Sequence, residues 1–154
     1  VAILMIDVDH FKHYNDSLGH PEGDRCLRTL ASLLAAHARR PGELVARYGG
    51  EEFVMVLPDT DHDQAVLQAE NILASVRRAA IPQPSGLERP HVSISIGVSS
   101  VLPTPDLSSA ALVAAADRAL YEVKRAGRNG WRYRAPEGGG LPEKKSLILT
   151  QAAV

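Results

Sequence analysis

The amino-acid sequence predicts an α/β sandwich: a mixed, mostly antiparallel central sheet flanked by helices, with a hairpin turned by two glycines. Three observations carry this prediction. Residues 2–8 are a nearly unbroken apolar run, residues 44–57 hold two strand-like runs joined by Gly-Gly, and other segments carry apolar residues at helical spacing. The order of strand, helices, hairpin, helix, strand, helix and strand is typical of ferredoxin-type or palm-type topology.

The composition indicates one globular domain. The chain has 154 residues, of which 45% are hydrophobic and 23% charged, so a single core can hold the fold. A net charge of −1 removes the electrostatic case for non-specific binding to nucleic acid or to a membrane surface. The single cysteine, Cys26, cannot form an intrachain disulfide. Any anionic ligand must therefore be held by local charges.

The first residues bear on where the protein resides. The apolar opening ends at Asp7, well short of the roughly 20 residues that a membrane-spanning helix needs, and it lacks the basic start of a signal peptide. We therefore expect a cytoplasmic location with no membrane contact by these residues, and leave open whether a parent protein is tethered to a membrane. Because the chain starts in a strand and without Met, we expect it to be part of a longer protein.

The first half of the chain divides into a strand, two helical segments and a hairpin. Residues 2–8 predict a central strand covered on both faces. A short polar helix or turn is expected at about 10–18, a loop at 19–23 and a helix at about 24–39. The two glycines within 44–57 can adopt the positive φ angles of a tight hairpin. The buried stripe of the longer helix is expected to contain Leu27, Leu30, Leu34 and Ala38.

The middle of the chain predicts a helix and a strand separated by a break. Thr60 or Asp61 can cap the helix, and four proline and glycine residues interrupt the chain at 82–90. Residues 91–99 alternate apolar residues with serine, which predicts a half-buried strand. The buried residues expected in the helix are Ala65, Ala69, Ile72, Leu73 and Val76.

The end of the chain predicts a last helix, a short strand and a tail. The helix is expected at about 107–126 and ends before Gly127, a residue that commonly follows a helix C-terminus. Trp131 and Tyr133 indicate a short closing strand. Residues 135–154 include three consecutive glycines and show little core-forming period, so we expect a flexible tail there.

Carboxylates follow two of the predicted strands. Asp7 and Asp9 end the first strand, and a period of two puts them on the same side. Glu51 follows the Gly-Gly turn, so both acids meet at one sheet edge if the hairpin lies beside the first strand. Carboxylate oxygens, together with a backbone carbonyl such as that of Val8, suit Mg²⁺ and a nucleoside triphosphate. A lone acid at a strand end is more often a solvated loop residue; Asp7 together with the Gly-Gly-Glu-Glu hairpin favours the metal site.

Four segments together resemble a known family. They are 7–24 (Asp-Val-Asp-His-Phe-Lys through Gly-His-Pro-Glu-Gly-Asp), 47–53 (Arg-Tyr-Gly-Gly-Glu-Glu-Phe), 95–98 (Ser-Ile-Gly-Val) and 119–129. In this order they resemble the GGDEF domain of diguanylate cyclases, in its Gly-Gly-Glu-Glu-Phe variant. The resemblance spans about residues 3–133, so we assign residues 1–134 to this domain and 135–154 to the tail. It also implies a nucleotidyl-cyclase-like palm topology.

The resemblance implies an activity. Such domains condense two GTP molecules into cyclic di-GMP, a bacterial second messenger, and release two pyrophosphates. The reaction takes place at the interface of a homodimer and uses Mg²⁺ or Mn²⁺, two ions per active site. An upstream sensor or dimerisation domain is expected in the full-length protein. The segment that normally opens the family's domain, Asp-x-Leu-Thr, is missing here, which is expected to lower the stability or activity of the isolated chain.

The family's functional residues fall on positions of this sequence. The metal ligands fall on Asp7, the Val8 carbonyl and Glu51, and Asp7 and Glu51 are also the expected catalytic residues. The guanine-contacting pair falls on Asn15 and Asp24, which suits guanine because its N1–H and amine can donate to a carboxylate, whereas adenine lacks that pair of donors. The remaining substrate-binding positions are His10, Phe11, Lys12, Leu27, Gly49, Gly50, Lys124 and Arg128.

One family site departs from its pattern. The product-binding inhibitory site is an Arg-x-x-Asp placed before the hairpin, and the corresponding residues here run from Arg40 to Glu43, with Pro41 between them. Because glutamate reaches one methylene farther and Pro41 stiffens the segment, we expect feedback inhibition to be weakened or absent.

Two other functions stay open from the sequence. One is a catalytically inactive GGDEF domain that binds GTP or cyclic di-GMP and signals to a partner, against which the intact Gly-Gly-Glu-Glu-Phe argues. The other is a palm-type cyclase or polymerase that acts on another nucleotide, against which Asn15 and Asp24 argue.

Overall fold

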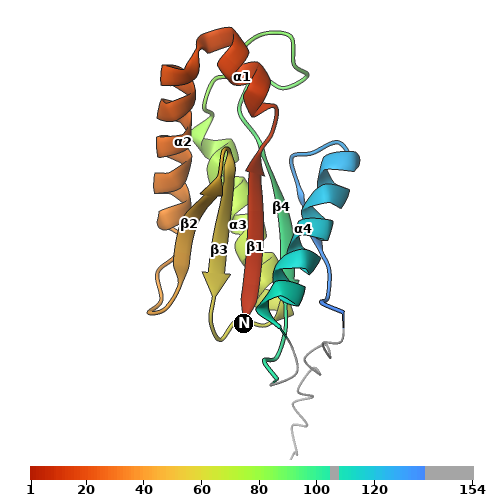
Figure 1. Ribbon diagram of the computed structural model, residues 1–154. Coiled ribbons are helices and arrows are strands. Elements are labelled where there is room, and N and C mark those ends of the chain that lie inside the picture. The colour runs from red at the N-terminus through yellow and green to blue at the C-terminus, as the bar shows by residue number, and fades with distance from the viewer. Residues whose placement is uncertain (105–107, 138–154) are drawn as a thin grey trace, which may run out of the picture.

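The computed structural model describes residues 1–104 and 108–137. In these residues a single five-stranded sheet has the order β2-β3-β1-β4-β5 (Figure 1). Neighbouring strands are antiparallel except β4 and β5, which are parallel, so the expected mixed, mostly antiparallel sheet is confirmed. The elements are β1 (Ala2–Val8), α1 (Phe11–Leu18), α2 (His20–Ala35), β2 (Leu44–Gly49), β3 (Glu52–Leu57), α3 (His62–Ala79), β4 (Ile94–Ser100), α4 (Ser109–Arg125) and β5 (Trp131–Tyr133).

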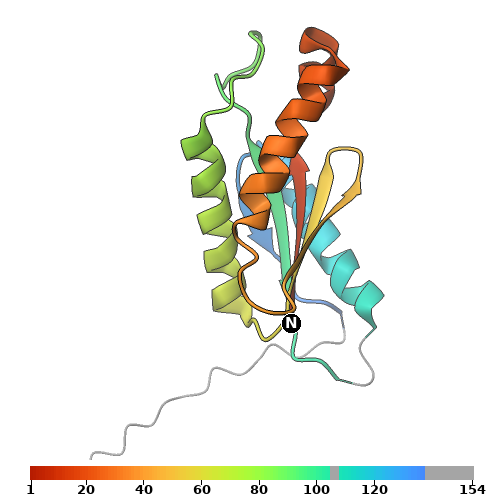
Figure 2. The same ribbon diagram turned by 90° about the vertical axis from the view of Figure 1, so that its left-hand side faces the viewer.

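Helices cover both faces of the sheet. Figure 2 shows α2 and α3 on one face and α4 on the other. The central strand β1 feeds both layers, because successive side chains point to opposite faces. Leu4 and Ile6 lie in the core with α2 and α3, whereas Ile3 and Met5 lie in the smaller core beneath α4. None of the helices in the described part of the chain is long and apolar enough to cross a lipid bilayer.

The helix α4 packs unusually close to the middle of β4. Gly97 makes this possible: a Cβ built there would lie 2.0 Å from the backbone oxygen of Ala116 and 2.4 Å from the backbone nitrogen of Leu120. The neighbours of Gly97 on this face, Ser95 and Ser99, are also small and fully buried. The expectation of a half-buried strand was therefore wrong. The serine residues suggested a solvent-exposed face, yet this face of β4 is the one that packs against α4.

The long helix α2 begins earlier than the sequence predicted. Residues 19–23 were expected to form a loop, but α2 starts at His20. Gly19, with φ 84°, precedes the helix. Pro21 lies in the first turn of α2, where a backbone N–H has no hydrogen-bond partner within the helix, so the proline costs no hydrogen bond. Gly23 is therefore part of the helix, and it is buried. The helix ends at Ala35, so the predicted extension to residue 39 was also wrong.

Helix boundaries elsewhere follow their capping residues. Asp61, one of the two predicted caps, accepts a hydrogen bond from the backbone of Gln64 at 2.9 Å and begins α3. The side chain of Ser108 caps α4, and Gly127 follows its end with φ 106°. Residue 107, where that helix was expected to begin, lies outside the described residues.

The predicted tail, 135–154, lies outside the described residues from 138 onward. In its described part Pro136 is buried, and Glu137 pairs with Arg118 of α4 at 3.1 Å. The chain therefore continues along α4 for a few residues after β5.

We expect Gly97→Ala to destabilise the fold strongly. The added methyl would meet helix backbone, which cannot move aside as a flexible side chain can, so a loss at or above the ~1–3 kcal/mol of ordinary overpacking is expected. Chemical denaturation measures it. The matched control is Gly130→Ala, where a Cβ would meet its nearest atom at 3.8 Å. Equal stabilities of the two variants would contradict the close packing of α4.

Candidate functional site

The acidic residues predicted as a site meet at one edge of the sheet. Asp7 stands at the end of β1 opposite Glu52 of β3, and the backbone N–H of Val8 contacts the carbonyl of Glu51 at 3.4 Å. The tip of the β2–β3 hairpin and the start of α1 lie at this same edge (Figure 1). Residues from two distant parts of the sequence thus form one acidic cluster, which we define as Asp7, Glu51 and Glu52.

The carboxylate of Asp7 is subject to opposing electrostatic effects. Only 7% of the residue is exposed, and burial raises the pKa of its carboxyl. The ammonium of Lys124, 2.7 Å from Oδ2, lowers that pKa in part, while the negative charges of Glu51 and Glu52 raise it. Lys124 thus pairs with Asp7, while Glu51 and Glu52 add negative charge close to the same carboxylate. The pairing of Lys124 with Asp7 was not anticipated from the sequence.

A cleft of about 490 Å³ opens beside the acidic cluster, between α1, α2 and the hairpin. Most of the residues that line it were predicted as substrate-binding or catalytic. Three were not: Asp16, His20 and Arg47. Of these, Arg47 had a signal in the sequence, its place two residues before the Gly-Gly turn. The predicted residues in the lining are Phe11, Lys12, Asn15, Asp24, Leu27, Gly50 and Glu51.

Other predicted residues lie outside this lining. Asp7 and Lys124 form their ion pair at the sheet edge, and Val8 is buried in the core. His10 is the residue before α1 and has a left-handed backbone with φ 57°. Gly49 ends β2 at the hairpin. None of these residues is among those that line the cleft.

Asn15 presents a buried acceptor with no partner. Its Oδ1 is inaccessible to solvent and makes no hydrogen bond with any described residue. The side chain reaches this position only because residue 23 is glycine, since a Cβ there would lie 1.8 Å from Oδ1. An unpaired buried acceptor costs free energy unless a ligand supplies a donor. Asn15 and Asp24 both line the cleft, and the Oδ1 of Asn15 is packed against Gly23 of α2.

The hairpin turn leaves space for a ligand. Gly50 has φ 52°, and a Cβ built at Gly49 or Gly50 would meet no atom within 4 Å. Arg47 stabilises the turn, because its Nε donates to the carbonyl of Gly50 at 2.7 Å. The glycines therefore serve the tight turn and at the same time expose its backbone.

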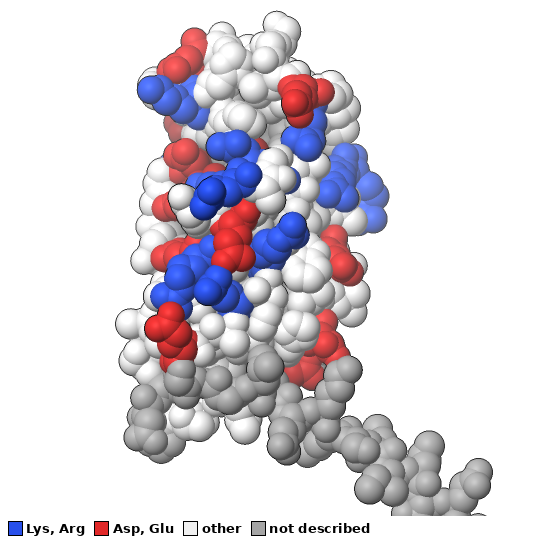
Figure 3. Space-filling model, turned by 90° about the vertical axis from the view of Figure 1, so that its right-hand side faces the viewer, with Lys and Arg blue, Asp and Glu red and all other residues white. Residues whose placement is uncertain are grey.

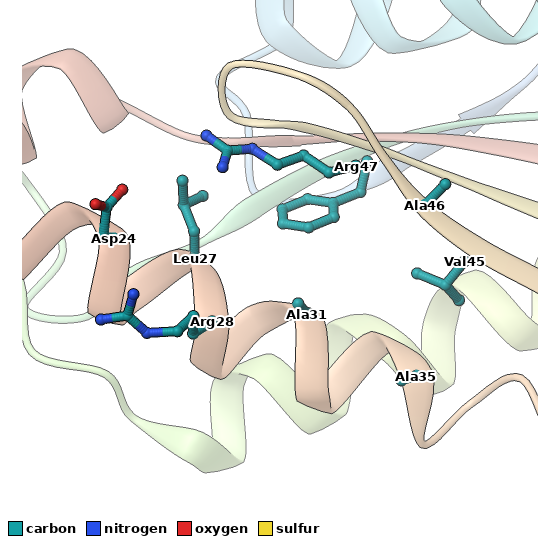
Figure 4. A pocket seen from close by; sticks show the side chains of 9 residues that line it. Asp24, Leu27, Arg28, Ala31, Ala35, Val45, Ala46 and Arg47 are labelled. Atoms are coloured by element: carbon teal, nitrogen blue, oxygen red, sulfur yellow. The ribbon is translucent and has the colours of Figure 1, made fainter.

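A second cleft adjoins the first along α2 (Figure 4). Asp24, Leu27 and Arg47 line both clefts. Figure 4 shows Asp24 and Arg47 at one end, with Val45 of β2 facing Ala35 of α2 toward the other. The second cleft is a mostly apolar groove that runs from Asp24 and Arg47 between α2 and β2.

Basic residues lie where α4 ends. Lys124 and Arg125 form its last turn, and Arg128 follows with a left-handed backbone at φ 64°. Figure 3 shows Lys and Arg side chains gathered on this side of the molecule. Lys124 thus lies against Asp7 of the acidic cluster, and Arg128 lies in the loop that follows α4.

The Arg40–Glu43 pair is already satisfied within the chain. Arg40 Nε contacts Glu43 Oε1 at 2.6 Å, and its Nη2 donates to Thr60 Oγ1 at 2.8 Å. Glu43 Oε2 accepts the backbone N–H groups of Arg39 and Arg40 at 2.7 and 2.8 Å. These backbone bonds, with the guanidinium of Arg40, lower the pKa of Glu43. The Arg40 side chain is 52% exposed, so only a ligand that bound its Nε edge would have to displace Glu43.

Comparison with known proteins identifies relatives across the domain. Residues 1–130 match the family described as "Diguanylate cyclase, GGDEF domain". Diguanylate cyclase A of Treponema denticola is 44% identical over 130 residues, which are 84% of this chain and 34% of that protein. The chain spans only 28–34% of the length of the first curated relatives it matches.

Solved structures of related domains share the fold. The GGDEF domain of DgcB from Caulobacter crescentus, in complex with c-di-GMP, superposes with a TM-score of 0.73 at 35% identity, covering 87% of this chain and 76% of that one. The active GGEEF domain of a diguanylate cyclase from Vibrio cholerae superposes with a TM-score of 0.70 at 37% identity, covering 88% and 81%.

Proposed function

The chain belongs to the GGDEF domain family of diguanylate cyclases, and from this membership we propose that it condenses two GTP molecules into cyclic di-GMP and two pyrophosphates. One observation carries the proposal most directly. The acidic cluster of Asp7, Glu51 and Glu52 lies beside a cleft in which the buried Asn15 acceptor has no partner. A metal-binding edge and a base-recognising pocket are the two parts that a nucleotide cyclase needs.

The acidic cluster fits divalent metal ions. The donors of Asp7, Glu51 and the Val8 carbonyl are hard oxygens, which Mg²⁺ and Mn²⁺ prefer. Lys124 already stands against Asp7 as a positive charge, and the remaining carboxylate charge favours more. We assign two ions per active site to these residues. When bound, such ions neutralise charge on the phosphates of the substrate.

Asn15 and Asp24 recognise guanine in this proposal. The orphaned Oδ1 of Asn15 accepts a hydrogen bond from the base, and the carboxylate of Asp24 accepts the N1–H and amine donors. Adenine offers no such pair, so both acceptors would stay unpaired with ATP. A site of this kind discriminates by on the order of 10⁴.

The remaining residues orient the triphosphate for in-line attack. Lys12, Lys124 and Arg128 bind the phosphates, and the open Gly49–Gly50 turn lets the backbone approach them. The 3′-hydroxyl of one GTP attacks the α-phosphorus of the other. A bond forms between the 3′-oxygen and that phosphorus, the bond to pyrophosphate breaks, and Glu51 takes the hydroxyl proton. Positioning and electrostatic stabilisation supply most of the rate.

The product requires two domains. Each domain offers one nucleotide site, whereas cyclic di-GMP is two-fold symmetric, so two chains must face each other with their hairpins opposed. An upstream domain that dimerises would raise the local concentration of the two sites. Such an arrangement agrees with the share of its relatives' length that this chain spans.

The main alternative is an inactive GGDEF domain that binds GTP or cyclic di-GMP and signals to a partner. The intact Gly-Gly-Glu-Glu-Phe segment of the hairpin favours the cyclase over a domain that only binds. Incubation of the protein with GTP and Mg²⁺, followed by detection of cyclic di-GMP, separates the two.

Glu51→Gln should abolish product formation while the fold stays intact. The substitution removes one metal-binding charge and the proton acceptor without changing side-chain size. Pyrophosphate release measures turnover, and circular dichroism measures folding. Glu70→Gln, an exposed change on α3, is the control and should retain full turnover. Near wild-type turnover of Glu51→Gln would remove Glu51 from the mechanism.

Specific activity should fall when the protein is diluted. Because catalysis needs two chains, turnover per chain depends on the fraction of dimer, which mass action reduces at low concentration. Assays over a hundredfold range of protein concentration, with sedimentation at the same concentrations, give both quantities. Turnover per chain that stays constant while the protein is monomeric would exclude the dimeric mechanism.

Selectivity for GTP should depend on Asp24. The ratio of kcat/KM for GTP over ATP is expected to fall at least ~10-fold in Asp24→Ala, because the pair of guanine donors loses its acceptor. Competition of GTP against ATP measures this ratio. Glu22→Ala, a carboxylate on the same helix outside the cleft lining, is the control. An unchanged ratio in Asp24→Ala would place base recognition elsewhere.

Cyclic di-GMP should bind the Arg40 site weakly, with Kd above about 1 μM. Glu43 holds Arg40 through charge-assisted bonds that the product would have to replace. Glu43→Asp shortens the carboxylate, loosens this hold and should tighten product binding in calorimetry. Submicromolar binding by the wild-type chain that is lost in Arg40→Ala would contradict this expectation.

A further inference from the structure

Asp9 is a buried carboxylate for which the proposed catalytic machinery has no use. It is 3% exposed. Its Oδ1 accepts from Ser95 Oγ at 2.6 Å, and its Oδ2 accepts from Ser93 Oγ at 2.6 Å and from the backbone N–H of Asn129 at 3.0 Å. These bonds turn the carboxylate toward β4 and the loop after α4, and not toward the carboxylates of the acidic cluster. Asp9 is therefore a buried anchor rather than a further metal ligand.

The loop that Asp9 holds has an unfavourable backbone. Gly127, Arg128 and Asn129 have φ angles of 106°, 64° and 51°, so three consecutive residues lie in the left-handed region. Glycine adopts this region freely and asparagine tolerates it, but arginine does so only when its surroundings hold it there. Such a loop keeps its shape only while its hydrogen bonds to the rest of the domain are made.

Those hydrogen bonds come from three elements. The N–H of Arg128 donates to Val123 of α4 at 3.0 Å, and Arg77 of α3 donates to the carbonyl of Asn129 at 3.2 Å. Asp9 supplies the third, at the backbone N–H of Asn129. The bond from Arg77 is exposed, whereas Asp9 is buried and is itself held by Ser93 and Ser95. Because a hydrogen bond away from water is electrostatically stronger, Asp9 is the buried tether of the residue that follows Arg128.

The end of β1 and the turn after it thus contact both cationic positions of the proposed phosphate site. Asp7 in β1 contacts Lys124 directly, and Asp9, in the turn two residues on, holds the loop that carries Arg128. We propose that Asp9 is a positioning residue for triphosphate binding: by fixing Asn129 it fixes Arg128 beside Lys124. This inference rests on the proposed function, in which Arg128 binds phosphate.

A double-mutant cycle on the 154-residue chain tests the proposal. The probe is α,β-methylene GTP with Mg²⁺, which cannot release pyrophosphate, and its Kd is measured by calorimetry. Arg128→Ala and Asp9→Asn are each expected to weaken binding by about tenfold. The double variant should bind about as weakly as Arg128→Ala alone, because Asp9 acts only through Arg128. Asp9→Asn keeps the side-chain size and one acceptor oxygen.

A second variant guards against misfolding. If Asp9→Asn does not fold, Ser93→Ala takes its place, since it removes one bond to Asp9 and leaves the charge; its smaller loss of affinity should again vanish in the Arg128→Ala background. Ser99→Ala is the matched control: Ser99 is a fully buried serine on the same face of the sheet, its Oγ makes no hydrogen bond with described residues, and its change should leave Kd as in the wild type.

The outcomes separate the inference from the function on which it rests. If the losses from Asp9→Asn and Arg128→Ala multiply to about a hundredfold, Asp9 acts independently of Arg128 and the inference is overturned while the cyclase proposal stands. The same holds if Asp9→Asn binds as the wild type does. If the wild-type chain binds no GTP analogue, or Arg128→Ala has no effect, the assignment of the phosphate site fails and the inference fails with it.

Discussion

The arrangement of the site depends on the close contact between α4 and β4. At Gly97 the backbone of α4 occupies the space that a side chain on β4 would need. The buried residues on either side, Ser95 and Ser99, are also small, so they leave room for the helix. This contact fixes where the C-terminal end of α4 lies relative to the end of β1. Lys124 then meets Asp7, and the loop after the helix meets Asp9. A helix held farther from the sheet would make neither contact.

Electrostatics explains why these contacts matter. Three carboxylates gather at one edge of the sheet, and burial already works against the charge of Asp7. Lys124 offsets part of this charge in the chain by itself. In the proposed function, Asp7 would hold a divalent cation and Lys124 would bind the phosphates of the substrate, so both charges would be compensated further. In the free chain the ion pair holds Lys124 against Asp7.

The cleft between α1, α2 and the hairpin is distinguished by an unmade hydrogen bond rather than by charge. Around Asn15 the chain leaves an acceptor without a partner, and the missing side chain of Gly23 is what allows this geometry. Folding alone gains nothing from that arrangement. In the proposed function a guanine base donates the missing hydrogen bond, which would make the arrangement favourable. Gly50, Glu51 and Arg47 of the hairpin line the other side of the cleft.

The sequence by itself determined the fold class, the Gly-Gly hairpin, the convergence of Asp7 with Glu51 and the family. Apolar periodicity and turn glycines are local signals, and they state which face of an element is buried. Only the tertiary structure decided that α2 starts at His20, that the serine face of β4 is buried and that Asp9 holds the loop after α4. The Lys124–Asp7 pair belongs to this second group, since 117 positions separate its members. Such contacts depend on how closely two elements pack, and packing distance is set by side chains that lie far apart in the chain.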